Sequence, residues 1–234
     1  PIEMPYNLLE TVFGATTRFI LMSGSLTRFT CQSLFPLDKI DFIEYPPVTE
    51  PKKCPIVLKP VAKESRKKIK VLAEAVRLIY STEGSPNTLV HVSYADQLRL
   101  ASFLADLKPI THTKDTKKEA IAQFKAAGGI LLGAGMAEGV DLPGDFCRLI
   151  IVPRLLFPNI GDEGVTKRLA MSDGQEWYNW TTMMTFVQQD GRAQRGTDEC
   201  KTYVLDPKFL ELLNKTKHEL NERFLEHIFK YKGP

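Results

Sequence analysis

The sequence TLVHV at residues 88–92 is short, apolar and rich in β-branched residues, which is typical of a buried strand. A helical pattern follows at 94–107, and Ser93 or Asp96 can cap its start. The alternation continues, and we expect helices at 116–127 and 176–189 and strands at 130–132, 149–152 and 201–205. Short apolar strands that alternate with helices favour a parallel sheet covered on both faces. The predicted fold class is α/β, a doubly wound, mainly parallel sheet flanked by helices.

The flanking parts of the chain extend this pattern less regularly. We expect an entry helix or linker at 1–16, a buried strand at 19–22, a proline-rich loop with one or two short strands at 35–60, and a helix at 65–80. Downstream we expect a long loop at 157–172 and a closing helix over 209–234 that one break could interrupt. Within the 176–189 helix, an apolar stripe is predicted from Trp177, Trp180, Met184 and Val187, with the two tryptophans in the core rather than stacked on a base. Residues 1–234 are interpreted as a single domain.

Composition excludes few classes of function. The 234 residues are 43% hydrophobic and 25% charged, and the net charge of +3 permits a nucleic-acid partner without requiring one. The apolar runs are too short to span a bilayer and no signal peptide opens the chain, so we expect no membrane partner and an intracellular location, cytoplasmic or in the nucleoid or nucleus. Residue 1 is a proline, which predicts a fragment or a processed product.

No complete active site of a familiar type is written in the sequence. It lacks a G-x-x-x-x-G-K-[ST] phosphate-binding loop and an acidic run that could close a strand around magnesium. Four cysteines (Cys31, Cys54, Cys147, Cys200) and four histidines (His91, His112, His218, His227) are scattered without ligand spacing, so no local metal site is predicted.

Three segments are expected at the carboxyl ends of the strands, where open α/β sheets bind ligands. They are SGSL at 23–26, GAGMAEGVD at 133–141, and QQDGRAQRG at 188–196. The glycines of the second segment allow backbone amides to approach an anion, or they form a tight turn with no ligand. Glu138 and Asp141 can accept a hydrogen bond from a ribose hydroxyl or a basic side chain, or they are solvated.

The third segment carries two arginines on one helical face. Arg192 and Arg195 are three residues apart, and a guanidinium is a planar charged fork that suits phosphate. Gln188 shares that face, and Gly191 removes a side chain in front of Arg192. An ordinary solvated helix face is the alternative interpretation.

In their order along the chain, these segments resemble the C-terminal RecA-like domain of superfamily 2 helicases of the XPD/DinG type. The segment at 23–26 resembles the family's S-G-T-L, with Ser25 in place of the usual threonine, and residues 89–94 resemble its strand that ends in Ser-Tyr. EGVDLPGD at 138–145 is similar to motif V, and Gln188-x-x-Gly191-Arg192-x-x-Arg195 is similar to motif VI. The similarity runs from about residue 15 to 208.

The resemblance implies roles for these residues. It implies an arginine finger at Arg195, with Arg192 and Gln188 beside the nucleotide as the remaining catalytic residues. It implies nucleotide-side contacts from Glu138, Gly139, Asp141 and Gly191. It implies a single-stranded DNA track formed by Ser93, Tyr94, Gly133, Gly135, Met136 and Lys114.

The resemblance also implies partners outside this chain. ATP and Mg²⁺ would be held mainly by an N-terminal RecA-like domain, which this sequence lacks, and an iron–sulfur cluster is possible there but not here. The chain alone is therefore expected to be inactive as an ATPase, in a DNA helicase that serves DNA repair. Two alternatives stay open: a non-enzymatic nucleic-acid-binding or protein-interaction module, and a nucleotide-sugar or phosphate-ester enzyme, for which no general base is evident.

Overall fold

The computed structural model describes residues 20, 41–43, 54–137, 139–192 and 199–230. Its centre is a six-stranded sheet in which every pair of neighbouring strands is parallel. The strands lie in the order β3 (Ile130–Ala134), β2 (Thr88–Val92), β4 (Leu149–Val152), β5 (Lys201–Val204), β1 (Ile56–Leu58), β6 (Ile228–Lys230). Thr88 of β2 is opposite Ile130 on one side and Leu149 on the other. The predicted parallel α/β sheet is confirmed.

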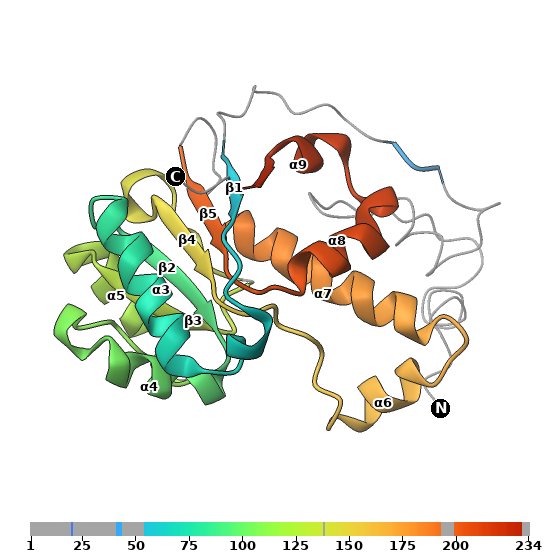
Figure 1. Cartoon of the computed structure of the whole chain (residues 1–234), viewed down its shortest axis with the longest axis horizontal. Helices are drawn as coiled ribbons and strands as arrows, with labels where there is room; N and C mark the ends of the chain where they lie inside the picture. Colours follow the sequence, from blue (N-terminus) through green and yellow to red (C-terminus); the bar gives the residue numbers. More distant parts are fainter. Residues whose placement is uncertain (1–19, 21–40, 44–53, 138, 193–198, 231–234) are drawn as a thin grey trace.

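Helices cover both faces of this sheet. The helices are α3 (Ile69–Thr82), α4 (Tyr94–Phe103), α5 (Lys117–Ala127), α6 (Glu163–Leu169), α7 (Gly174–Asp190), α8 (Phe209–Thr216) and α9 (Glu222–Glu226). Figure 1 shows α3 and α4 on one side of the strands and α7 and α8 on the other. Successive residues of a strand point to opposite faces of the sheet and pack into two separate hydrophobic cores. Leu89 and Ile150 pack with α5, α7 and α8, whereas Val90 and Ile151 pack with α3 and α4.

Local chemistry explains where two helices begin. Ser93 caps α4 because its side-chain oxygen accepts a hydrogen bond from the Asp96 backbone N–H at 3.2 Å. Asp162 caps α6 in the same way, accepting from the Val165 N–H at 3.1 Å. The predicted long loop at 157–172 is therefore wrong in part, because residues 163–169 are helical. No residue of α6 is buried, so the apolar periodicity that reveals other helices is missing there.

Two further expectations need correction. The closing helix predicted over 209–234 is instead α8, a 3₁₀ turn at Lys217–Glu219, the short helix α9 and strand β6, with 231–234 outside the described residues. The buried stripe of α7 runs through Trp180, Met183 and Phe186 rather than through Met184 and Val187, so the buried face of the helix is rotated relative to the predicted one. Trp177 is only half-buried, and the Arg168 guanidinium lies 5.3 Å from its ring centre.

The predicted elements at 1–16 and 19–22 fall almost wholly outside the described residues.

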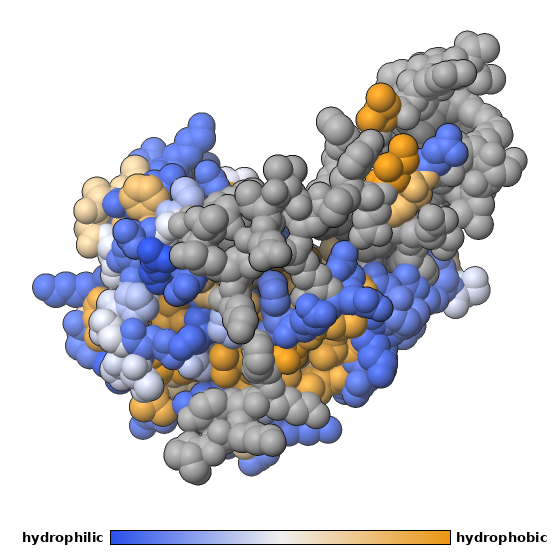
Figure 2. All heavy atoms as spheres, turned by 90° about the horizontal axis from the view of Figure 1, so that it is seen from above, coloured by the Kyte–Doolittle hydropathy of each residue, from blue (hydrophilic) through white to orange (hydrophobic). Residues whose placement is uncertain are grey.

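No helix within the described ranges combines the length and apolar character needed to cross a membrane. Seen from above, the described surface mixes hydrophilic and hydrophobic areas (Figure 2).

Candidate nucleotide and nucleic-acid interface

The carboxyl ends of the strands bring together several of the residues expected to act. Strand β2 runs into Ser93 and Tyr94, and the neighbouring β3 runs into Gly135. The Tyr94 side chain is 43% exposed, and its ring meets that of His112 edge-on, with 5.9 Å between centres. A Cβ on Gly135 would lie 3.5 Å from the Tyr94 hydroxyl oxygen, so these two predicted nucleic-acid residues are neighbours. An exposed aromatic ring beside open backbone is the kind of surface on which a base can stack.

The loop after β3 uses its glycines in different ways. Gly135 and Gly139 have φ values of +62° and +68°, a conformation that favours glycine, and both are exposed. Gly133 is buried inside β3, where a Cβ would lie 2.8 Å from Leu89 Cδ1 and 2.9 Å from Met136 Sδ. Met136 itself has no exposed surface. Gly133 and Met136 thus have packing roles, and neither is exposed at the surface.

Basic side chains border the same loop. Lys114 is exposed in the segment before α5. Lys117 donates a hydrogen bond from Nζ to the Gly135 carbonyl at 2.8 Å, which fixes the loop from the α5 side. This places a fixed cation at the base of the loop and an exposed one nearby in sequence.

The end of α7 is tied to the glycine-containing loop. Helix α7 ends at Asp190, Gly191 follows, and Arg192 folds back so that its Nε donates to the Gln188 carbonyl at 2.9 Å. Its Nη1 donates to the Val140 carbonyl at 3.1 Å. Gly191 has an ordinary helical φ of −67°, so its backbone conformation does not require glycine. Asp141 is exposed next to this contact.

Arg195 and Glu138 lie outside the described residues, as does the segment at 23–26. Their predicted roles stay predictions.

Buried polar groups lie beneath the Arg192 contact. His91 on β2 is buried, and its pKa is lowered to about 3, mainly by burial. A backbone contact with Gln189 opposes that shift, and the charge of Arg192 adds to it. The Gln189 side chain is also fully buried, and its amide has no hydrogen-bond partner among the described residues. Both ring nitrogens of His91 likewise have no hydrogen-bond partner among the described residues, so two buried polar side chains without partners lie near the Arg192 contact.

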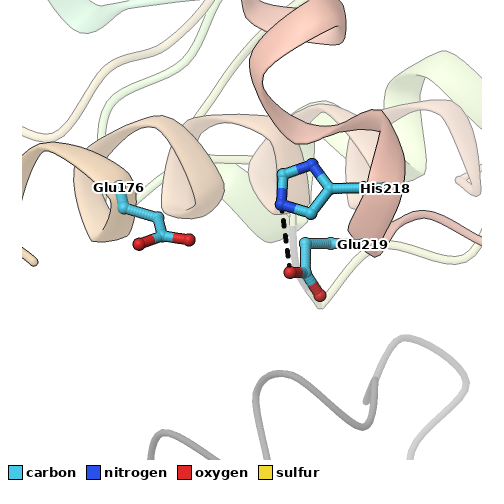
Figure 3. A group of neighbouring side chains, drawn as sticks. All are labelled: Glu176, His218 and Glu219. Atoms are coloured by element: carbon cyan, nitrogen blue, oxygen red, sulfur yellow. Dashed lines mark ion pairs between the residues drawn. The ribbon is translucent and has the colours of Figure 1, made fainter.

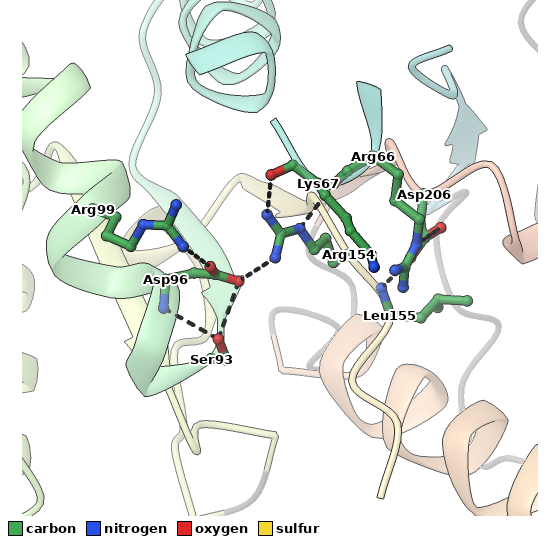
Figure 4. Close-up of polar contacts among 8 residues, drawn as sticks. All are labelled: Arg66, Lys67, Ser93, Asp96, Arg99, Arg154, Leu155 and Asp206. Atoms are coloured by element: carbon green, nitrogen blue, oxygen red, sulfur yellow. Dashed lines mark hydrogen bonds and ion pairs between the residues drawn. The ribbon is translucent and has the colours of Figure 1, made fainter. Parts of the chain in front are cut away.

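An ion-pair network at the carboxyl ends of β4 and β5 was not anticipated from the sequence (Figure 4). Asp206 is buried, and its Oδ1 and Oδ2 atoms accept a shared hydrogen bond from Arg66 Nε at 2.8 and 2.9 Å. It also accepts from the backbone N–H groups of Leu155 at 2.9 Å and Lys208 at 3.0 Å.

The second half of this network reaches α4. Arg154 donates to the Asp96 carboxylate at 2.8 Å and to the Arg66 and Lys67 carbonyls at 3.0 and 3.3 Å. Asp96 also accepts from the Ser93 hydroxyl at 3.1 Å. The cap of α4 is thus held to the loop that follows β4. Arg154 and Asp206 each lie two residues after a buried strand, which is a signal visible in the sequence, but their partners are far away along the chain.

Six parallel strands, helices on both faces and a glycine loop tied to an arginine-bearing helix end define a RecA-like α/β domain. Residues 81–227 match the family model described as the helicase C-terminal domain. This chain belongs to the helicase C-terminal domain family.

Solved structures share this fold. An XPD helicase aligns with 18% identity and a TM-score of 0.66, over 95% of this chain and 44% of that one. Xpd4 of S. tokodaii aligns with 16% identity and a TM-score of 0.64, over 96% and 47%. Dbp5 of S. cerevisiae, solved with RNA and ADP BeF3, aligns with 13% identity and a TM-score of 0.57, over 95% and 53%. This chain spans about half the length of each of these three. No curated protein sequence matches it significantly.

Proposed function

We propose that this chain is the C-terminal motor domain of an intracellular, ATP-dependent DNA helicase of the XPD/DinG type. The observation that carries the proposal is the hydrogen bond between Arg192 and the Val140 carbonyl. It joins the two segments whose sequences resemble motifs V and VI. Membership of the helicase C-terminal domain family supports the same reading.

On the nucleotide side, Arg195 acts as the arginine finger that offsets charge on the γ-phosphate of ATP. Gln188 and Arg192 border the same nucleotide, and Glu138, Gly139, Asp141 and Gly191 line the cleft. ATP and Mg²⁺ are held mainly by an N-terminal RecA-like domain, because this sequence has no phosphate-binding loop. Any iron–sulfur cluster belongs to that other domain.

On the nucleic-acid side, Tyr94 stacks on a base of single-stranded DNA while Ser93 and Lys114 contact the backbone. The exposed backbone of Gly135 completes this track. ATP binding draws the two domains together and hydrolysis releases them, so that their alternating grips move the strand.

The test is single-turnover ATP hydrolysis by a protein with both RecA-like domains, with and without single-stranded DNA, and with RNA for comparison. We expect DNA to stimulate hydrolysis, and Arg195→Ala to reduce it by about 10³-fold or more while ATP still binds. Arg77→Ala is the matched control, since Arg77 lies on α3 and pairs with Asp106.

Two results contradict the proposal. Hydrolysis that DNA does not stimulate, or an Arg195→Ala variant as active as wild type, shows a non-enzymatic binding module instead. Robust, Arg195-dependent turnover by this chain alone shows that no second domain is needed.

A further inference from the structure

A group of metal-ligand side chains lies away from the interface described above, where α7 begins and α8 ends. Glu176 is in the first turn of α7, and His218 and Glu219 are in the 3₁₀ turn that follows α8. One carboxylate oxygen of each glutamate and one ring nitrogen of His218 all lie within 4.8 Å of one another. Figure 3 shows the Glu176 carboxylate reaching from its helix toward the other two side chains. The three donors thus converge from two separate elements.

The convergence occurs at a hollow in the protein. Its volume is about 280 Å³, and Gln175, Asn179, Trp180, Lys215 and Thr216 line it together with the three donors. Trp180 and Thr216 are buried beneath it, at 7% and 3% exposure. There is therefore room for an ion and its water ligands beside the donors.

Helices α7 and α8, next to which the donors lie, pack against each other. Helices α7 and α8 pack through Phe186 and Phe209, whose ring centres are 4.7 Å apart. Thr216 donates from its hydroxyl to the Leu212 carbonyl at 2.9 Å, just before the turn with His218 and Glu219. The two elements that carry the donors therefore pack against each other, while the Glu176 and His218 side chains themselves are exposed.

The charges at this place are incompletely balanced. His218 Nε2 is 3.2 Å from a Glu219 carboxylate oxygen, and the Glu219 side chain is only 19% exposed. Lys215, the cation that lines the hollow, is paired with Glu211 at 2.7 Å. Two carboxylates and one imidazole thus meet at this place.

We propose that Glu176, His218 and Glu219 bind a divalent transition-metal ion, with Zn²⁺ as the fitting representative. One imidazole nitrogen and two carboxylate oxygens form a donor set that zinc accepts, and a fourth position stays open for water. Mg²⁺ and Ca²⁺ prefer oxygen ligands alone and are disfavoured here by the imidazole. The ion bridges the start of α7 to the end of α8 and links the two helices. This proposal does not depend on helicase activity.

The test is calorimetric titration of the protein with Zn²⁺ under reducing conditions, with Mg²⁺ as the comparison ion. We expect one saturable zinc site per chain that His218→Ala or Glu176→Gln weakens by about 100-fold or more. Glu222→Gln is the matched control, because Glu222 is exposed on α9 and outside the donor set. Zinc binding to the native state should also raise the thermal unfolding midpoint of wild type and of Glu222→Gln alone.

A second readout identifies the ligand directly. The ¹⁵N resonances of the His218 ring should shift on adding Zn²⁺ to wild type, and circular dichroism of each variant checks that it is folded. The proposal is overturned if zinc does not saturate a site, or if His218→Ala and Glu176→Gln bind zinc as tightly as Glu222→Gln does. It is also overturned if Mg²⁺ competes at equal affinity.

Discussion

Arg192 Nη1 donates a hydrogen bond of 3.1 Å to the backbone carbonyl of Val140, which joins the end of α7 to the loop that follows β3. The Nε of Arg192 also donates to the Gln188 carbonyl at 2.9 Å, so two hydrogen bonds fix the position of its guanidinium group. The loop position at Gly139 and Asp141 therefore depends on a side chain about fifty residues further along the chain.

Arg192→Ala removes both of these hydrogen bonds. Bonds from a charged donor contribute about 1.5–3 kcal/mol, so we expect amide hydrogen exchange at residues 139–142 to become about tenfold faster or more. Exchange is measured by mass spectrometry of peptides, with Arg77→Ala as the control. Unchanged exchange in the loop would show that other contacts hold it.

Asp206→Ala removes the acceptor for Arg66 and for two backbone N–H groups. Breaking a buried ion pair from one side costs about 3–5 kcal/mol, because the remaining cation is left without compensation. Urea unfolding should show this loss. Asp106→Asn breaks an exposed pair with Arg77 and should leave stability nearly unchanged. Equal effects of the two variants would contradict the importance of the buried network.

Gly133→Ala places a methyl group between Leu89 and Met136, at distances of 2.8 and 2.9 Å from their nearest atoms. Overpacking of this kind costs about 1–3 kcal/mol, and thermal unfolding should record it. Gly191→Ala is the comparison, since its Cβ would lie 3.4 Å from the nearest atom, the Val187 carbonyl oxygen. The packing role assigned to Gly133 fails if the two variants unfold at the same temperature.

His91 makes stability depend on pH. Its pKa is lowered from 6.5 to about 3 in the folded chain, so between these values the unfolded chain binds more protons. The contribution of neutral His91 to the free energy of unfolding is fully present above about pH 6.5. It declines as the pH falls toward 3, by at most about 5 kcal/mol. We expect His91→Leu to flatten the decline measured by urea unfolding between pH 7 and pH 4. Parallel curves for wild type and variant would rule His91 out as the cause.

Tyr94→Ala tests the proposed DNA track. Stacking of a base on an aromatic ring contributes about 1–3 kcal/mol, so affinity for single-stranded DNA should fall about 5- to 150-fold. Leu98→Ala, one turn further along α4 and 70% exposed, is the control for nonspecific surface effects. Fluorescence anisotropy with labelled oligonucleotides measures both. Equal affinities would place the track elsewhere.

The sequence predicts those parts of the fold that repeat a simple pattern. The strands at Thr88–Val92 and Leu149–Val152 have the predicted limits, because both are continuous apolar runs buried on both sides. Helix α6 escapes prediction because it buries no side chain and depends on the Asp162 cap. Strand β6 is missed because three residues after a short helix carry no alternation long enough to separate a strand from a helix end.

The site is less predictable than the fold. Sequence similarity groups Ser93, Tyr94 and Arg192 in one site, and in the structure Ser93 and Tyr94 directly follow the carboxyl end of β2. It does not reveal that Arg192 binds Val140, because nothing local encodes a contact between a side chain and a distant carbonyl. The Arg66–Asp206 pair, separated by 140 positions, is hidden for the same reason.

Strand β1 also has consequences for synthesis of the protein. Ile56 lies opposite Thr202 of β5 and Ile228 of β6, so both neighbours of this strand are made long after it. A ribosome that has reached the end of α7 has already supplied β2, β3 and β4, which can pair with one another, while β1 still lacks both partners. Completion of the sheet therefore waits until translation of this region is nearly finished, and during that interval the nascent chain carries an apolar segment for chaperones to protect.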